Sequence, residues 1–136
     1  MKALSLHQPW AWLVAGGLKD VENRPWRTWY RGLLAIRATR DQGPSYYAEA
    51  VRQIAEISPG LALPDRRQLA YGSVIGLVNV RGCERQSESP WFWGPWGWAL
   101  IWARRIDEPV ACRGQRGIWT LPLDVAYEVV RRDPHW

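Results

Sequence analysis

The amino-acid sequence predicts an α+β fold, a small β-barrel of about five to six strands flanked by two to three helices. Three observations lead to this prediction. Apolar runs at residues 73–80, 98–106 and 117–121 concentrate the strand signals in the second half of the chain. The apolar residues of 46–57 and 124–132 recur instead at helical spacing. Glycines and prolines interrupt these patterns, and no internal repeat or linker divides residues 1–136, which are expected to form one domain.

The remaining elements are predicted in the first part of the chain. Residues 2–6 alternate weakly between apolar and polar types, which is typical of a strand. Pro9 suits the first turn of a short helix over residues 10–15, which a pair of glycines would end. Residues 21–24 and 33–36 are the next two predicted strands.

Arginine dominates the charge of this protein. The net charge is +5 and the sequence pI is about 9.7, a balance that favours anionic partners, nucleic acid first. Lys2 and Lys19 are the only lysines among the 18 basic residues. Genome composition alone can produce this excess of arginine over lysine. Against that background, the presence of Lys19 inside a charged motif is noticeable. Most of the 11 tryptophans are expected to fill the core and its rim.

Neither a metal nor another cofactor is predicted. Cys83 and Cys112 lie far apart, and His7 and His135 are the only histidines, so the spacing of a Cys/His zinc site is missing. Free thiols are typical of cytosolic proteins. No signal-peptide pattern and no apolar run of roughly 20 residues occurs in the sequence. We therefore expect a soluble, cytoplasmic protein that makes no membrane contact.

Arginines alternate with aromatic residues in the stretch that follows Glu22. No acidic residue lies between Glu22 and Asp41. Guanidinium groups bind phosphate oxygens in pairs, and flat rings stack on unpaired bases. In the alternative interpretation the rings pack beneath loops and the arginines are merely solvated. The residues predicted here to bind nucleic acid are Trp26, Arg27, Trp29, Tyr30 and Arg31.

Two loops could contribute further contacts. Residues 90–98 are rich in tryptophan, and their glycines and prolines exclude a long regular element. We expect most of these rings to cover the core and Trp96 and Gly97 to form a cleft wall, although the loop could also dock a protein partner. In residues 113–119, glycines on both sides of Arg116 could let the backbone approach a phosphate. A plain turn between strands explains these glycines equally well.

Lys19, Glu22 and Arg24 bring unlike charges together within a few residues. If Val21 points inward, Glu22 and Arg24 share the opposite strand face, and Lys19 reaches that face only from the turn or through a bulge. Exposed ion pairs of this kind contribute about 0–1 kcal/mol to stability. The functional alternative is a polar pocket floor. Catalysis by Lys19 would need a pKa well below about 10.4, and Glu22 could then orient the amine or relay a proton.

The first part of the chain resembles the ASCH domain (activating signal cointegrator homology). Residues 4–11, Leu-Ser-Leu-His-Gln-Pro-Trp-Ala, precede Gly17-x-Lys19-x-x-Glu22-x-Arg24, and this G-x-K-x-x-E-x-R signature of the family is complete here. The resemblance continues through residues 30–32, 89–98 and 114–119.

The resemblance implies a barrel similar to the PUA fold, with a cleft lined by the signature and with RNA or another nucleic acid as ligand. The first hypothesis is therefore an RNA-binding module. The second is a hydrolase in which Lys19 and Glu22 are catalytic, because some similar proteins are reported as ribonucleases. A branch of amidohydrolases acts on acylated cytidine with a Lys, a Thr and a Glu. The Thr position of that branch is Glu22 here, which argues against the amidase chemistry. A protein-interaction module is the third hypothesis.

Overall fold

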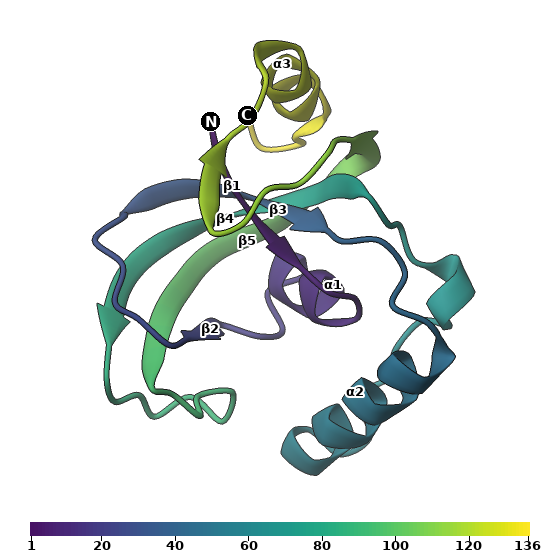
Figure 1. The fold of residues 1–136 in the computed structure, drawn as a ribbon, viewed down its shortest axis with the longest axis vertical. Coiled ribbons are helices and arrows are strands. Elements are labelled where there is room, and N and C mark those ends of the chain that lie inside the picture. Colours follow the sequence, from purple (N-terminus) through teal and green to yellow (C-terminus); the bar gives the residue numbers. More distant parts are fainter.

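The computed structural model describes residues 1–136 (Figure 1). In chain order the elements are β1 (Lys2–Leu6), α1 (Trp10–Ala15), β2 (Val21–Arg24), β3 (Gly32–Ala38), α2 (Pro44–Ile57), the 3-10 helix η1 (Arg66–Gln68), β4 (Ser73–Glu84), β5 (Trp96–Ala111), β6 (Ile118–Thr120) and α3 (Leu123–Arg132). This set of helices and strands confirms the predicted α+β architecture, with a sheet and flanking helices.

All the strands belong to one sheet, in the order β2-β5-β4-β3-β1-β6. Only β1 and β3 run parallel, because α1 and β2 lie between them in the chain, and every other pair is antiparallel. Register shifts interrupt the β3–β4 and β4–β5 pairs. Such bulges bend strands and increase their twist. The sheet accordingly curls into a half-barrel, and α1 lies inside the curl (Figure 1).

The central strands are buried on both faces. On the concave face Val14 of α1 packs in one cluster with Leu34 of β3. On the other face Val129 of α3 packs in a second cluster with Leu77 of β4. A smaller cluster joins α1 and α2 to Trp91 in the tryptophan-rich loop. Because helices cover both faces, the first half of β4 is buried continuously and lacks the alternation typical of a half-exposed strand.

Two strands are longer than the sequence predicts. β4 continues beyond Val80 to Glu84, and β5 extends to Ala111 through Pro109. A proline has no N–H to donate and is tolerated where one strand edge is free. β2 pairs only with residues 96–99 of β5, so the edge of β5 at Pro109 has no second partner strand.

Three findings bear on the chemistry that the fold can host. No helix combines the length and the apolar character needed to cross a membrane. No three side chains of His, Cys, Asp or Glu lie close enough together to hold a metal ion. Cys83 is buried and Cys112 is half-buried, and both are free thiols.

Candidate functional site

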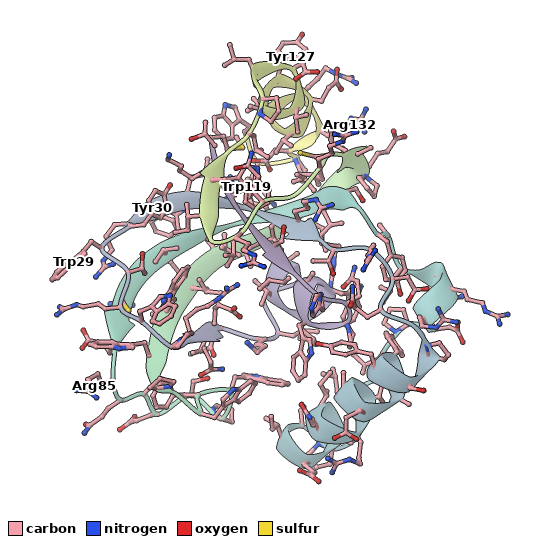
Figure 2. The ribbon with its side chains drawn as sticks, viewed as in Figure 1. Trp29, Tyr30, Arg85, Trp119, Tyr127 and Arg132 are labelled. Carbon is pink, nitrogen blue, oxygen red and sulfur yellow. The ribbon has the colours of Figure 1, made fainter.

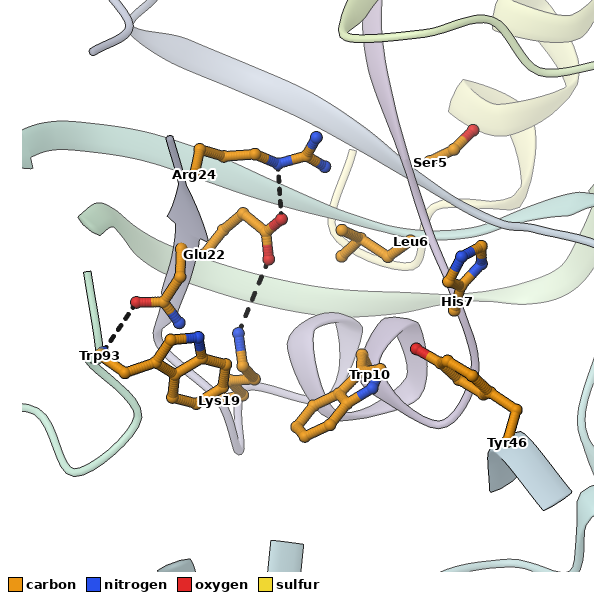
Figure 3. A pocket seen from close by; sticks show the side chains of 10 residues that line it. Ser5, Leu6, His7, Trp10, Lys19, Glu22, Arg24, Tyr46 and Trp93 are labelled. Carbon is orange, nitrogen blue, oxygen red and sulfur yellow. Dashed lines mark hydrogen bonds and ion pairs between the residues drawn. The ribbon is translucent and has the colours of Figure 1, made fainter. Parts of the chain in front are cut away.

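A pocket of about 330 Å³ opens beside α1, where the end of β1, the strand β2, the start of α2 and the tryptophan-rich loop meet (Figure 3). It is lined by the aromatic side chains of Trp10, Tyr46 and Trp93 and by the charged side chains of Lys19, Glu22 and Arg24, together with Ser5, Leu6, His7 and Asn23. The three charged residues of the signature therefore lie in one cavity, beside three large rings.

The Glu22 carboxylate lies between the two cations (Figure 3). Arg24 donates from Nε to Oε2 of Glu22 at 2.7 Å, and Nζ of Lys19 lies 3.6 Å from Oε1. Glu22 and Arg24 share a face of β2, and Lys19 reaches them from the turn that follows α1. Glu22 and Arg24 therefore lie on one face of the strand, and Lys19 comes from the turn, as the sequence predicts.

Lys19 is 2% exposed, which is rare for a lysine. Its amine also donates to the Val21 carbonyl, and it lies 5.2 Å from the ring centroid of Trp93 and 5.9 Å from that of Trp10. Burial lowers the pKa of Lys19 below the usual 10.5, while the Glu22 carboxylate opposes this shift. The ring faces favour the charged amine as well. The pocket thus holds a buried amine whose charged form is favoured mainly by the Glu22 carboxylate and less by Asp20.

Asn23 fastens the tryptophan-rich loop to β2. Its side-chain oxygen accepts from the backbone N–H groups of Trp93 and Gly94 at 2.9 and 3.1 Å, and its amide nitrogen donates to the Trp91 carbonyl at 3.0 Å. This clamp holds Trp93 beside Lys19. The sequence interpretation expected Trp96 and Gly97 to form the cleft wall, but in this pocket Trp93 takes that place.

We expect Asn23→Ala to lower the free energy of unfolding by about 1–3 kcal/mol, because the backbone N–H groups of the loop lose their acceptor. Urea unfolding followed by circular dichroism measures the change. Gln53→Ala is the matched control, since its amide is exposed on α2 and makes only a 3.3 Å bond to Glu49. The control should change stability by less than about 0.5 kcal/mol. Equal losses in both variants would contradict the clamp.

Several residues that the sequence predicts as nucleic-acid contacts form a second group, outside the pocket. The Arg27 guanidinium lies 4.0 Å from the ring centroid of Trp29 and 5.5 Å from that of Trp96, and the Arg85 guanidinium lies 5.2 Å from the Trp96 ring. We call Trp29, Arg27, Trp96 and Arg85 the Arg–Trp strip; Figure 2 shows Trp29 and Arg85 at one margin of the molecule. Trp96 is the sheet partner of Arg24, so the strip begins beside the pocket.

The other predicted contact residues are dispersed. Trp26 is exposed. Tyr30 packs against the core, and its hydroxyl donates a hydrogen bond to the Leu33 carbonyl. Its side chain is therefore less exposed than those of Trp29 and Arg31. Arg31 is exposed and donates to carbonyls of its own turn. Arg116 is exposed in the loop before β6. None of these side chains lines the pocket.

Seven of the ten residues that line the pocket were not among the predicted site residues: Ser5, Leu6, His7, Trp10, Asn23, Tyr46 and Trp93. His7 and Trp10 lie within the motif of residues 4–11, which carried a signal for the segment but no individual role. Tyr46 at the start of α2 had no signal, because only the tertiary structure brings that helix to the pocket. The rings of His7 and Tyr46 meet edge to face, 5.3 Å apart.

Comparison with known proteins gives matches in sequence. Residues 4–93 match the model of the ASCH domain family. Over 85 residues the chain is 32% identical to activating signal cointegrator 1 of Homo sapiens and, to the same extent, of Mus musculus. The matched region is 62% of this chain but 15% of either relative, so the chain corresponds to a small part of these longer proteins.

Solved structures match along nearly the whole chain. The crystal structure of ASCH from Zymomonas mobilis aligns with a TM-score of 0.56 and 15% identity, covering 96% of this chain and 93% of that one. A single-residue variant of the same protein aligns with a TM-score of 0.60 and 14% identity, covering 96% of both chains. At this identity the likeness concerns the fold, and it confirms the expected small α+β fold with a curled sheet.

Proposed function

This chain belongs to the ASCH domain family, and on that basis we propose that it binds RNA and holds one unstacked base in the pocket around Lys19, Glu22 and Arg24. The family is generally considered RNA-binding. The net charge of +5 favours the same partner class. We extend the binding domain to residues 1–136, because β5 and β6, which lie beyond the family match, complete the sheet on which the pocket is built.

The observation that carries this proposal is the pairing of aromatic walls with a charged floor. Trp10, Tyr46 and Trp93 offer ring faces or edges to a flat ligand, and the pocket volume is within the range of small-ligand sites. Arg24 uses only its Nε in the ion pair with Glu22, so its terminal amino groups can donate to a base carbonyl or to a phosphate. Glu22 can accept from an exocyclic amine with its remaining lone pairs.

The Arg–Trp strip would bind the nucleotides that neighbour the held base. Trp29 is 75% exposed with the Arg27 guanidinium against its ring, an arrangement that offers a stacking platform and a cation at one place. Trp96 lies opposite Arg24 in the sheet. An RNA strand that leaves the pocket at Arg24 would therefore reach the Arg–Trp strip directly. Trp26, Tyr30, Arg31 and Arg116 are proposed as outer contacts on the same grounds of charge and aromatic character.

The test is fluorescence anisotropy with labelled single-stranded RNA at 50 and 200 mM salt. The parent protein should lose affinity steeply with salt, because phosphate contacts release counterions. Trp93→Ala should weaken binding about 5- to 150-fold, the effect of losing a base stack of about 1–3 kcal/mol. Its salt dependence should equal that of the parent, because the indole carries no charge.

Trp136→Ala is the matched control, since Trp136 is 65% exposed and Trp93 55%, but Trp136 lies at the C-terminus and outside the pocket. This variant should bind like the parent. A parent protein that does not bind RNA, or a Trp93→Ala protein with full affinity, would overturn the proposed base pocket.

A hydrolase is the second candidate function, and the observation favouring it is the buried Lys19 amine, whose pKa burial lowers. A lysine tuned in this way can act as a general base. Glu22 is the only carboxylate of the pocket and is engaged by both cations, so it is not placed as a free acid–base group. Incubating the same RNA with the parent and with Lys19→Met, and reading fragments on gels, separates the two functions. Cleavage by the folded parent alone would place hydrolysis first.

A further inference from the structure

A second cavity, of about 400 Å³, adjoins the pocket and has no apolar side chain in its lining. We call it the polar cavity. Its lining includes His7 and Ser5, which line the pocket as well, and Arg37, Arg40 and Gln115, which do not. No carboxylate contributes to it. A cavity that is lined by polar residues and carries two arginines is suited to an anion.

Neither arginine of the polar cavity has an acidic partner. Arg37 donates from Nε to the Cys112 carbonyl at 2.6 Å and from Nη1 to Ser5 Oγ at 3.3 Å, so neutral acceptors fix its guanidinium without neutralising it. Arg40 is exposed and forms no ion pair. Asp41, the acidic residue next to Arg40, is paired with Arg66 instead. Two positive charges therefore remain available to a ligand.

Gly114 brings the loop before β6 against one of these arginines. A Cβ at this position would lie 2.3 Å from Nη1 of Arg37 and 2.9 Å from Ser5 Oγ, so a larger residue would displace the guanidinium. The backbone can approach only because the side chain is absent. The loop thus forms one side of the polar cavity while leaving Arg37 in place beside Ser5.

His7 connects the polar cavity to the pocket. Its Nδ1 lies 2.6 Å from Oγ1 of Thr39, a residue of the polar cavity, and its ring meets Tyr46, a wall of the pocket. The pocket and the polar cavity thus share a wall formed by Ser5 and His7, so a single ligand can place one part in each. A flat group in the pocket and an anionic group in the polar cavity would be linked past His7 and Ser5.

We propose that the polar cavity is the phosphate site of the same ligand: it binds the backbone phosphate attached to the nucleotide whose base occupies the pocket, through Arg37 and Arg40. This inference rests on the proposed RNA binding and adds where the backbone runs. The strand then enters at the polar cavity, places its base among Trp10, Tyr46 and Trp93, and leaves past Arg24 towards the Arg–Trp strip. The ligand class is a nucleotide within a phosphate-linked strand.

The salt dependence of RNA affinity tests this proposal with the probe used above, a labelled single-stranded RNA. Each phosphate contact in a single strand contributes about 0.7 to the slope of log affinity against log salt. Arg37→Gln and Arg40→Gln should each make this negative slope shallower by about that amount. Each should also weaken binding about tenfold at 50 mM salt. The double variant should make the slope shallower by about twice as much.

Arg81→Gln is the matched control, because Arg81 is exposed on β4, forms no ion pair and lies outside both cavities, while the change in net charge is the same. Its slope should equal that of the parent. Arg40→Gln, at an exposed position, tests the site even if Arg37→Gln does not fold. An unchanged slope in Arg40→Gln and in the folded double variant would overturn the phosphate site while leaving the base pocket intact. Trp93→Ala reports on the base pocket separately, by weakening binding at an unchanged slope.

Discussion

Glu22→Gln should lower the free energy of unfolding by about 3–5 kcal/mol at neutral pH, since it leaves Lys19 as a buried cation without its counter-ion. The glutamine keeps the shape of the side chain and its ability to accept from Arg24, so the loss reports mainly the charge. Arg24 is more exposed than Lys19 and adds little to the penalty. Urea unfolding at pH 7 measures the effect.

The destabilisation should depend on pH in one direction. The pKa of Lys19 in the folded protein already lies below the unfolded value of about 10.5, because burial disfavours the charged amine. Without Glu22 the pKa falls further, so the unfolded chain binds the additional proton over a wider range of pH. Stability then rises with pH between the lowered folded pKa and the unfolded one. The gap between Glu22→Gln and the parent should therefore narrow as pH rises from the folded Lys19 pKa of the variant to the higher folded pKa of the parent, and stay constant above it.

Glu56→Gln serves as the control for this experiment. Glu56 pairs with Arg52 on the exposed face of α2, where both side chains are more than half exposed. Loss of such a surface pair changes stability by about 0–1 kcal/mol. A Glu22→Gln protein no less stable than the Glu56→Gln protein would show that Lys19 does not need its counter-ion.

Asp133→Asn should also destabilise the protein by about 3–5 kcal/mol, because it removes the partner of Arg104 on the face covered by α3. The Asp133 side chain is fully buried, and Arg104 donates from Nε and Nη2 to its carboxylate at 2.8–3.1 Å. This fork joins the end of α3 to β5. Glu128→Gln, which loses more exposed pairs on α3, is the control and should lose at most about 1 kcal/mol.

The Asp133 pair should make stability sensitive to acid. Burial raises the pKa of Asp133, but hydrogen bonds from Arg104 and from the His135 N–H outweigh it, so the folded pKa lies below the unfolded 3.8. A carboxylate with a lowered pKa contributes stability above its unfolded pKa and loses it as pH falls through the folded value. The gap between Asp133→Asn and the parent should therefore be constant from pH 7 to about pH 5 and shrink below pH 3.8. A gap independent of pH would contradict the ionic origin.

The base pocket should be unaffected by this change. Asp133 lies after α3, and no residue of α3 lines the pocket or the polar cavity. The folded Asp133→Asn protein is therefore expected to bind RNA like the parent. Trp93→Ala is expected to bind RNA weakly, although it removes a side chain that is more than half exposed. The two variants separate loss of stability from loss of a binding contact.

The sequence by itself determined the type and approximate position of the main helices and strands, and the local geometry of the signature. The repeat of a strand or a helix is visible in residues that are close in sequence. Residues 73–80 therefore indicated a strand and residues 46–57 a helix without knowledge of the rest of the chain. The parity of Glu22 and Arg24 on β2 follows from the strand repeat alone, as does the need for Lys19 to come from a turn. The charge and the density of arginine likewise required no structure.

Only the tertiary structure decided which distant segments meet. Tyr46 enters the pocket because α2 returns to α1, and Trp93 takes the wall expected of Trp96 because Asn23 anchors the loop. Arg37 and Gly114 share the polar cavity because β1 places β3 and β6 on its two sides. Sheet order and register result from the packing of the whole chain, and local periodicity does not contain them. The walls of both cavities therefore could not be read from any single stretch of residues.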